Sequence, residues 1–131
     1  MKIFDLQQAR EILPLIKAIV SEVVDKRSEL YLLEERLEEE QDPLEKLYIE
    51  SQIRELDQDI RRGLQKIEAL GGVIKGLDPI LVDFLSFHEN RYIWLCWKED
   101  EEDINYWHEL NEGFAGRKPV EILELKNPEN P

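Results

Sequence analysis

The residue types best suited to chemistry gather toward the carboxyl-terminal part of the sequence. Cys96, the only cysteine, and His108, one of two histidines, fall within residues 92–119, a segment that also holds all three tryptophans. Asp83 precedes them inside the apolar run Leu-Val-Asp-Phe-Leu. Thiolate, imidazole and carboxylate are ligand types that Zn²⁺ accepts. The set therefore predicts a site for zinc or iron, with His108 as its first ligand and Cys96, Asp83 or Glu109 beside it.

The same residues also have ordinary structural explanations. None of the candidate ligands are paired at the local spacing of a metal-binding motif. A free cysteine is most often a small buried core residue, and a histidine is more often a hydrogen-bonded structural residue than a ligand. The sequence leaves both interpretations open.

Asp83 needs a partner, because an unpaired carboxylate is costly to bury. Arg117 lies in a turn framed by Gly113 and Gly116, and an arginine can bind a carboxylate through two parallel hydrogen bonds. We expect Asp83 and Arg117 to pair near His108, either as a structural pair or within a ligand site. The candidate site for a small-molecule ligand of unknown identity comprises Asp83, Trp97, His108, Glu112 and Arg117.

The sequence contains no complete catalytic constellation. The two adjacent glycines Gly71 and Gly72 are not followed by the Lys-Ser/Thr helix start of a phosphate-binding loop. No Glu-x-x-His pair of the kind that builds di-metal centres in helical bundles is present. This pattern favours a non-enzymatic binding or structural module. The alternative is a small metal-binding protein or metalloenzyme using Cys96, His108 and nearby carboxylates.

Strands are expected to position these candidates. Residues 92–97 and 104–108 are rich in aromatic and β-branched residues, as is typical of strands. Short extended segments are expected at 73–75 and 80–84, and a last edge strand at 120–125. Cys96 and His108 would then lie on adjacent strands, with Asp83 on a third.

Two long helices are expected before the strands. Apolar residues recur at alternating spacings of three and four between residues 6 and 37 and again between 44 and 70. Asp42 and Pro43 separate the two runs as an N-cap and a first helical residue. So short a connection requires the helices to pack antiparallel.

The predicted fold class is therefore α+β. A long antiparallel helical hairpin occupies residues 1–72, and a small antiparallel β-rich domain occupies residues 73–131. A homodimer through the hairpin is also expected, because one apolar row is left without a partner in the chain, and large exposed apolar patches are rare on monomers. That row consists of Leu13, Val20, Val24 and Tyr31.

Composition and net charge limit the classes of binding partner that we expect. The formal net charge is −13, from 30 acidic and 17 basic residues, which argues against binding to nucleic acid. No apolar run is long enough to span a membrane. A single cysteine cannot form an internal disulfide, so a reducing cytoplasm is the expected location.

Several segments resemble a bacterial family, the domain of unknown function twenty-two-oh-three. Two differences are local: Leu85 stands where the family commonly has proline, and an acidic turn replaces a glycine-bearing one. The family name implies no function. The resemblance lies in Phe4-Asp5-Leu6-Gln7-Gln8-Ala9, Leu77-Asp78, Leu81-Val82-Asp83-Phe84, Leu95-Cys96-Trp97, Tyr106-Trp107-His108-Glu109 and Glu112-Gly113-Phe114-Ala115-Gly116-Arg117-Lys118-Pro119.

Overall fold

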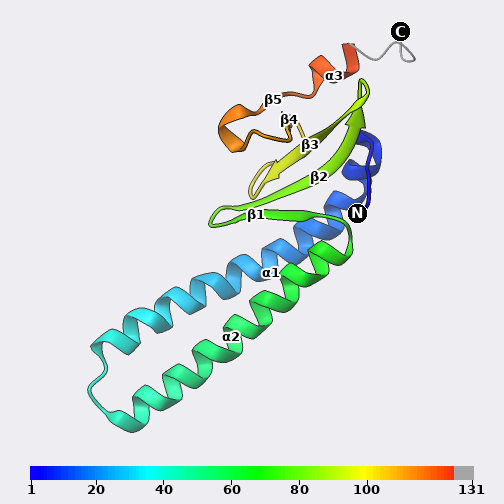
Figure 1. Ribbon diagram of the computed structural model, residues 1–131. Coiled ribbons are helices and arrows are strands. Elements are labelled where there is room, and N and C mark those ends of the chain that lie inside the picture. Colours follow the sequence, from blue (N-terminus) through cyan, green and yellow to red (C-terminus); the bar gives the residue numbers. More distant parts are fainter. Residues whose placement is uncertain (126–131) are drawn as a thin grey trace. The chain divides into compact units, whose positions relative to one another are not determined.

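The computed structural model describes residues 1–125, with side chains described through residue 123. The order of its secondary-structure elements confirms the expected α+β class, since a long antiparallel helical hairpin precedes a five-stranded antiparallel sheet (Figure 1). The elements are α1 (Leu6–Glu39), α2 (Pro43–Ala69), β1 (Val73–Leu77), β2 (Ile80–His88), β3 (Arg91–Lys98), β4 (Tyr106–Glu109), the 3₁₀ turn η1 (Phe114–Gly116), β5 (Lys118–Pro119) and α3 (Glu121–Leu125).

The ends of the long helices follow local sequence signals. Asp5 Oδ1 accepts from the backbone N–H of Gln8 at 2.7 Å, and the Gln8 side chain accepts from the backbone N–H of Asp5 at 3.0 Å, a reciprocal capping box. Asp42 caps α2 by accepting from the N–H of Leu44 at 3.1 Å. Gly71 follows α2 with a φ of +105°, a conformation that favours glycine.

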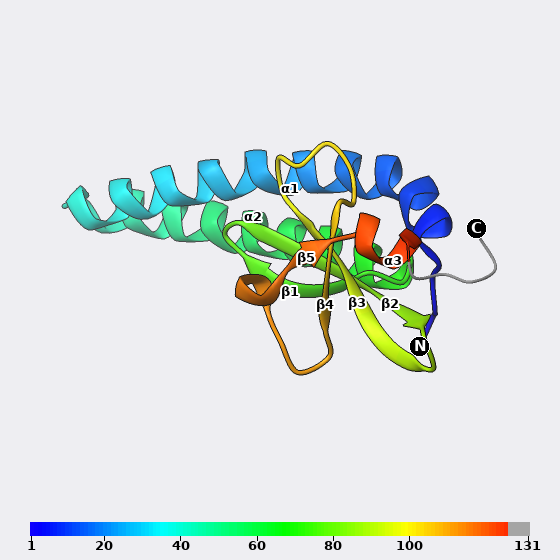
Figure 2. The same cartoon turned by 90° about the horizontal axis from the view of Figure 1, so that it is seen from above.

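The five strands pair in their chain order, each antiparallel to the next. Figure 2 shows the same sheet from above. Glu89 and Asn90, both with positive φ, form the two-residue turn between β2 and β3. No helix among residues 1–125 combines the length and apolar character needed to cross a membrane.

The expected edge strand at residues 120–125 is wrong. The strand that pairs with β4 is the shorter β5, and the chain then turns into α3. Val120 and Leu123 are both buried, and the Leu123 N–H donates to the Val120 carbonyl at 2.9 Å. Burial of residues three apart suits a helical turn, because a strand would place them on opposite faces.

The sheet has two different faces. Phe4 packs edge-on against Phe84 at 5.2 Å between ring centroids, and Leu6 of α1 lines the same surface hollow as Leu95. We call this the inner face; it carries Val82, Phe84, Ser86, Ile93, Leu95, Trp97 and Trp107. The opposite, outer face carries Asp83, Leu85, Phe87, Tyr92, Trp94, Cys96, Tyr106 and His108.

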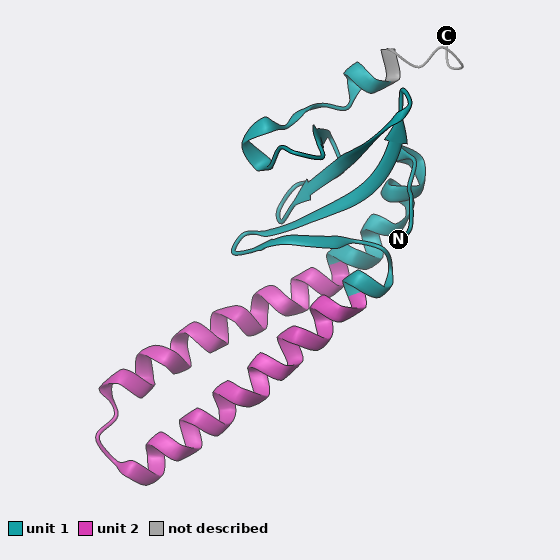
Figure 3. Cartoon of the chain, in the orientation of Figure 1, with its two compact units in different colours: residues 1–17, 67–131 teal, residues 18–66 magenta. Residues whose placement is uncertain are grey.

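The chain forms two compact units (Figure 3). The first joins residues 1–17 to those from 67 onward and contains the sheet; the second is residues 18–66, the greater part of the hairpin. The domain boundary expected at residue 72 stays a prediction, and residues 126–131 of the expected second domain lie outside the described residues.

Within the hairpin unit, an extra Cβ on Gly63 would come within 2.5 Å of a Val23 methyl carbon, so the two helices approach closely there. The apolar row expected to lack partners is only partly exposed. Leu13 and Val20 are buried, whereas Tyr31 is exposed. Further large apolar side chains are exposed around the turn of the hairpin: Leu32, Leu44, Leu47 and Tyr48.

Candidate functional site

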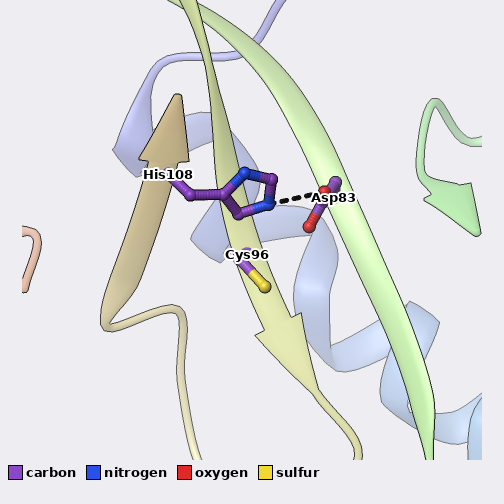
Figure 4. Close-up of side chains that lie close together, drawn as sticks. All are labelled: Asp83, Cys96 and His108. Atoms are coloured by element: carbon purple, nitrogen blue, oxygen red, sulfur yellow. Dashed lines mark hydrogen bonds and ion pairs between the residues drawn. The ribbon is translucent and has the colours of Figure 1, made fainter. Parts of the chain in front are cut away.

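Three adjacent strands bring the candidate ligands together on the outer face. Asp83 of β2 lies directly opposite Cys96 of β3, and His108 of β4 lies opposite Trp94, two residues earlier on β3. Figure 4 shows the imidazole reaching over β3 toward the Asp83 carboxylate, with the Cys96 sulfur beside them. Pairing register and strand alternation together place the three side chains on one face.

The cluster is closed to water. Asp83, Cys96 and His108 are 1%, 1% and 2% exposed. One donor atom from each residue can be chosen so that all lie within 4.8 Å of one another. His108 Nε2 lies 2.9 Å from Asp83 Oδ2, a hydrogen-bonding distance. Burial at this level means that these polar groups must satisfy one another or a bound ion.

A hydrogen bond made by Nδ1 fixes the orientation of the His108 ring. Nδ1 lies 2.9 Å from the backbone carbonyl of Glu109. A carbonyl can only accept, so Nδ1 carries a proton and donates it. Nε2 is therefore the nitrogen presented to Asp83. This arrangement, with Nδ1–H held by a carbonyl and Nε2 directed inward, is the one that metal-bound histidines commonly have.

The two oxygens of Asp83 have different surroundings. Oδ2 receives His108 and also lies 3.5 Å from Lys75 Nζ. Oδ1 is buried and has no hydrogen-bond partner among the residues that the structure describes. A buried carboxylate oxygen without a partner is costly, because its hydration is lost and not replaced. Asp83 thus has unused capacity to accept a proton donor or a cation.

Cys96 is a protonated thiol in this environment. Burial raises its pKa to about 12, with a further contribution from the negative charge of Asp83. Arg117, whose Nη1 lies 3.9 Å from the sulfur, acts in the opposite direction but does not outweigh burial. Such a thiol is a poor nucleophile at neutral pH, since the reactive species is the thiolate. A bound metal ion would lower the thiol pKa and could remove the proton outright.

Arg117 does not pair with Asp83, contrary to expectation. Its guanidinium binds Glu101 through two hydrogen bonds of 2.9 and 2.8 Å. It also lies 4.0 Å from the centroid of the Tyr106 ring and 4.3 Å from that of Phe114. The acidic turn after β3 supplies a nearer carboxylate for Arg117, while His108 and Lys75 pair with Asp83.

The Arg117–Glu101 pair is strong enough to overcome its own burial. Burial alone would raise the pKa of Glu101, but hydrogen bonds from Arg117 and from the Lys98 N–H hold that pKa below its usual value. Burial likewise opposes the charged form of Arg117, yet its bonds to Glu101 and Cys96 raise the Arg117 pKa. Both groups are therefore charged at neutral pH.

The family model for an uncharacterized conserved protein, DUF2203, matches residues 2–120. The chain belongs to the DUF2203 family. No curated protein and no solved structure matches it. The family description carries no activity, so inference about this DUF2203 chain rests on the site itself.

Three other predicted site residues lie apart from the cluster in this DUF2203 chain. Trp97 is buried on the inner face, where its Nε1 donates to the Glu101 carbonyl at 2.9 Å. The Glu109 carboxylate binds Arg91, and only its backbone carbonyl reaches His108. Glu112 pairs with Lys118 at 2.8 Å. Of the predicted residues, the structure brings together Asp83, Cys96 and His108, with Arg117 beside the sulfur.

Two residues that contact the candidate site, Lys75 and Glu101, had no distinctive signal in the sequence. Lys75 is the extra residue at an irregularity in β1, where the pairing register shifts between Ile74 and Gly76. A bulge re-aims its side chain, so simple alternation does not give its direction. Glu101 is one of five consecutive acidic residues, 99–103, and nothing in their types distinguishes it. A lysine among the apolar residues of a short strand was the only hint available for Lys75.

Proposed function

We propose that this DUF2203 protein binds a divalent transition metal ion, zinc in the first place and iron in the second, through Asp83, Cys96 and His108. The supporting observation is the buried cluster in which one donor atom from each residue lies within 4.8 Å of the others. Sulfur, imidazole nitrogen and carboxylate oxygen together are a ligand set that zinc accepts. The proposal is for a binding protein, with no assigned reaction.

The dimensions are compatible with an ion at the centre. Zinc lies about 2.0–2.3 Å from such ligand atoms, which places the atoms roughly 3.3–3.8 Å apart in a tetrahedron. Side-chain shifts of about 1 Å would therefore close the cluster around an ion. The ion would take the place of the contact between His108 Nε2 and Asp83 Oδ2, and it would offer a partner to the unsatisfied Oδ1 of Asp83.

The nearest cationic group, the ammonium of Lys75, must move away when a metal ion binds. Lys75 lies 3.5 Å from Asp83 Oδ2 and would repel a cation there. Its side chain is already 36% exposed, so the ammonium group can retreat into water at small cost. Metal binding should therefore compete with the Lys75–Asp83 contact and leave the Arg117–Glu101 pair in place.

Metal analysis of the full chain tests the proposal. The protein is purified without chelator and without an affinity tag, and its zinc and iron contents are measured by mass spectrometry. We expect about one ion per chain, and we expect His108→Ala to lose it. His88→Ala, which removes the other histidine, is the matched control and should keep it. Full occupancy in His108→Ala would remove His108 from the site.

A second variant guards against misfolding, because replacing a buried histidine can unfold the sheet. Cys96→Ser retains the size of the side chain but offers a much weaker ligand. Cobalt(II) added to the wild-type chain should give an intense thiolate-to-metal absorption band. That band should be absent from a folded Cys96→Ser chain. An unchanged band in Cys96→Ser would exclude Cys96 as a ligand.

We also propose self-association through the hairpin unit, independently of the metal site. The supporting observation is the set of exposed apolar side chains around its turn: Tyr31, Leu32, Leu44, Leu47 and Tyr48. Light scattering at micromolar concentration should give twice the chain mass of 15.6 kDa. Leu47→Glu should restore the single-chain mass, whereas Leu77→Glu, at an exposed leucine of the sheet, should not. A wild-type mass near 15.6 kDa would contradict the dimer.

A further inference from the structure

Two cationic side chains approach the Asp83–Cys96–His108 cluster from opposite edges of the sheet. Lys75 belongs to the edge strand β1, and its Nζ lies 3.5 Å from Asp83 Oδ2. Arg117 immediately precedes the other edge strand, β5, and its Nη1 lies 3.9 Å from Cys96 Sγ. Neither residue is a ligand type for a metal ion, yet each contacts one of the proposed ligands.

The side chains of Arg117 and Lys75 differ in how firmly they are held. Arg117 is held by two hydrogen bonds to Glu101 and by the rings of Tyr106 and Phe114, and its side chain is only 11% exposed. Its charge is already balanced by Glu101. Lys75 rests on the Trp94 ring at 4.0 Å and lies 3.5 Å from the Asp83 carboxylate. Once a metal ion engages Asp83, the Lys75 ammonium becomes available to another anion.

We propose that the metal site binds a small oxyanion, a carboxylate or a phosphate, between the ion and the ammonium group of Lys75. This inference rests on the proposed metal site. Three protein ligands leave one position of a tetrahedral ion for an exogenous ligand, as in catalytic rather than structural zinc sites. A divalent ion neutralised by the Asp83 carboxylate and the Cys96 thiolate has no net charge. Lys75 then adds one positive charge that an anion can balance.

Lys75 is suited to this role by its position between the cluster and the solvent. Its side chain is about one-third exposed, whereas Asp83 is almost fully buried. An incoming anion therefore meets the ammonium group first. The acidic chain as a whole repels anions, but salt screens that repulsion over about 8–10 Å, while contact with an ion and an ammonium group is hardly screened.

The experiment uses the full chain loaded with cobalt(II), which reports its own coordination by absorption. Inorganic phosphate and acetate are titrated separately at constant ionic strength. We expect a saturable change in the cobalt absorption with at least one of them. Lys75→Met should keep cobalt but lower the affinity for the anion by about tenfold or more, because it removes the ammonium group that pairs with the anion. Lys75→Arg should restore part of the affinity, and Lys46→Met, at a lysine of the hairpin unit, should match the wild type.

The outcomes separate the two proposals. A chain that takes up no cobalt contradicts both the metal site and the oxyanion. If the chain shows the thiolate-to-cobalt band but responds to neither anion, the metal site is supported and the proposal of an oxyanion ligand is contradicted. Equal affinities in the wild type and Lys75→Met exclude the role of Lys75. A response to phosphate alone, or to acetate alone, identifies which oxyanion the site accepts.

Discussion

In the hairpin, Lys26 and Asp59 pair at 3.6 Å with 37% and 30% of their side chains exposed, whereas in the sheet His108 and Asp83 pair at 2.9 Å with 3% and 2% exposed. Water screens the first pair and hydrates both of its members. The second pair has lost its water, so each group depends on the other. Similar side-chain chemistry therefore has very different energetic weight in the two regions.

This difference separates the charged residues of the two regions by what burial costs them. Charged residues of the hairpin need no function beyond keeping its surface hydrated. The buried cluster is different, because apolar residues of similar volume would fill the same space without desolvating a carboxylate. Ionisable groups held in such surroundings are enriched at functional sites, which is the physical reason for placing the proposed metal there.

The largest expected effect comes from breaking the buried pair. Asp83→Ala in metal-free protein should lower the free energy of unfolding by about 3–5 kcal/mol, because it leaves His108 buried without its partner. Asp59→Ala in the hairpin is the matched control and should cost less than about 1 kcal/mol apart from helix propensity. Urea denaturation with a chelator present measures both. A loss below about 1 kcal/mol in Asp83→Ala would mean that the cluster is not energetically coupled.

An intermediate effect is expected at Arg117. Arg117→Lys keeps the charge but loses the two-pronged bond to Glu101 and the stacking between Tyr106 and Phe114. We expect a loss of about 1.5–3 kcal/mol.

The matched change in the hairpin is Arg36→Lys, where the pair with Glu45 is 3.9 Å long and largely exposed. It should change the unfolding free energy by less than about 0.5 kcal/mol. Equal losses in the two variants would show that burial does not distinguish the two regions.

Much of the fold could be predicted because its signals are local. A capping residue and its helix start are adjacent in the sequence, so Asp42 and Pro43 marked the start of α2 correctly. The aromatic and β-branched composition of residues 92–97 marked β3 correctly. The local signals gave a wrong prediction at residues 120–125, because burial of Val120 and Leu123 in the tertiary structure favours a helical turn.

The candidate site could be predicted only by residue type. A thiol, an imidazole and a carboxylate in apolar strands were conspicuous, and the sheet does bring Asp83, Cys96 and His108 together. Their partners were not predictable. Choosing Glu101 from the five consecutive acids 99–103 for Arg117, and Lys75 for Asp83, depends on turn geometry and on a register shift in β1. Pairing between distant side chains is decided by three-dimensional approach, for which the order of residues gives no measure.

The smallest expected effect sharpens the comparison most directly, because two lysines are closely matched. Lys26 and Lys75 are 37% and 36% exposed and lie 3.6 and 3.5 Å from an aspartate, but Asp59 is 30% exposed and Asp83 only 2%. Lys26→Met should change the unfolding free energy by about 0–1 kcal/mol, and added salt should reduce even that. Lys75→Met in metal-free protein should cost more, about 1.5 kcal/mol, since Asp83 keeps His108 but loses its lysine partner. Parallel urea titrations of the two variants at low and moderate salt measure the difference. If the two losses agree within error at both salt concentrations, the burial of the aspartate is not what separates the sheet from the hairpin.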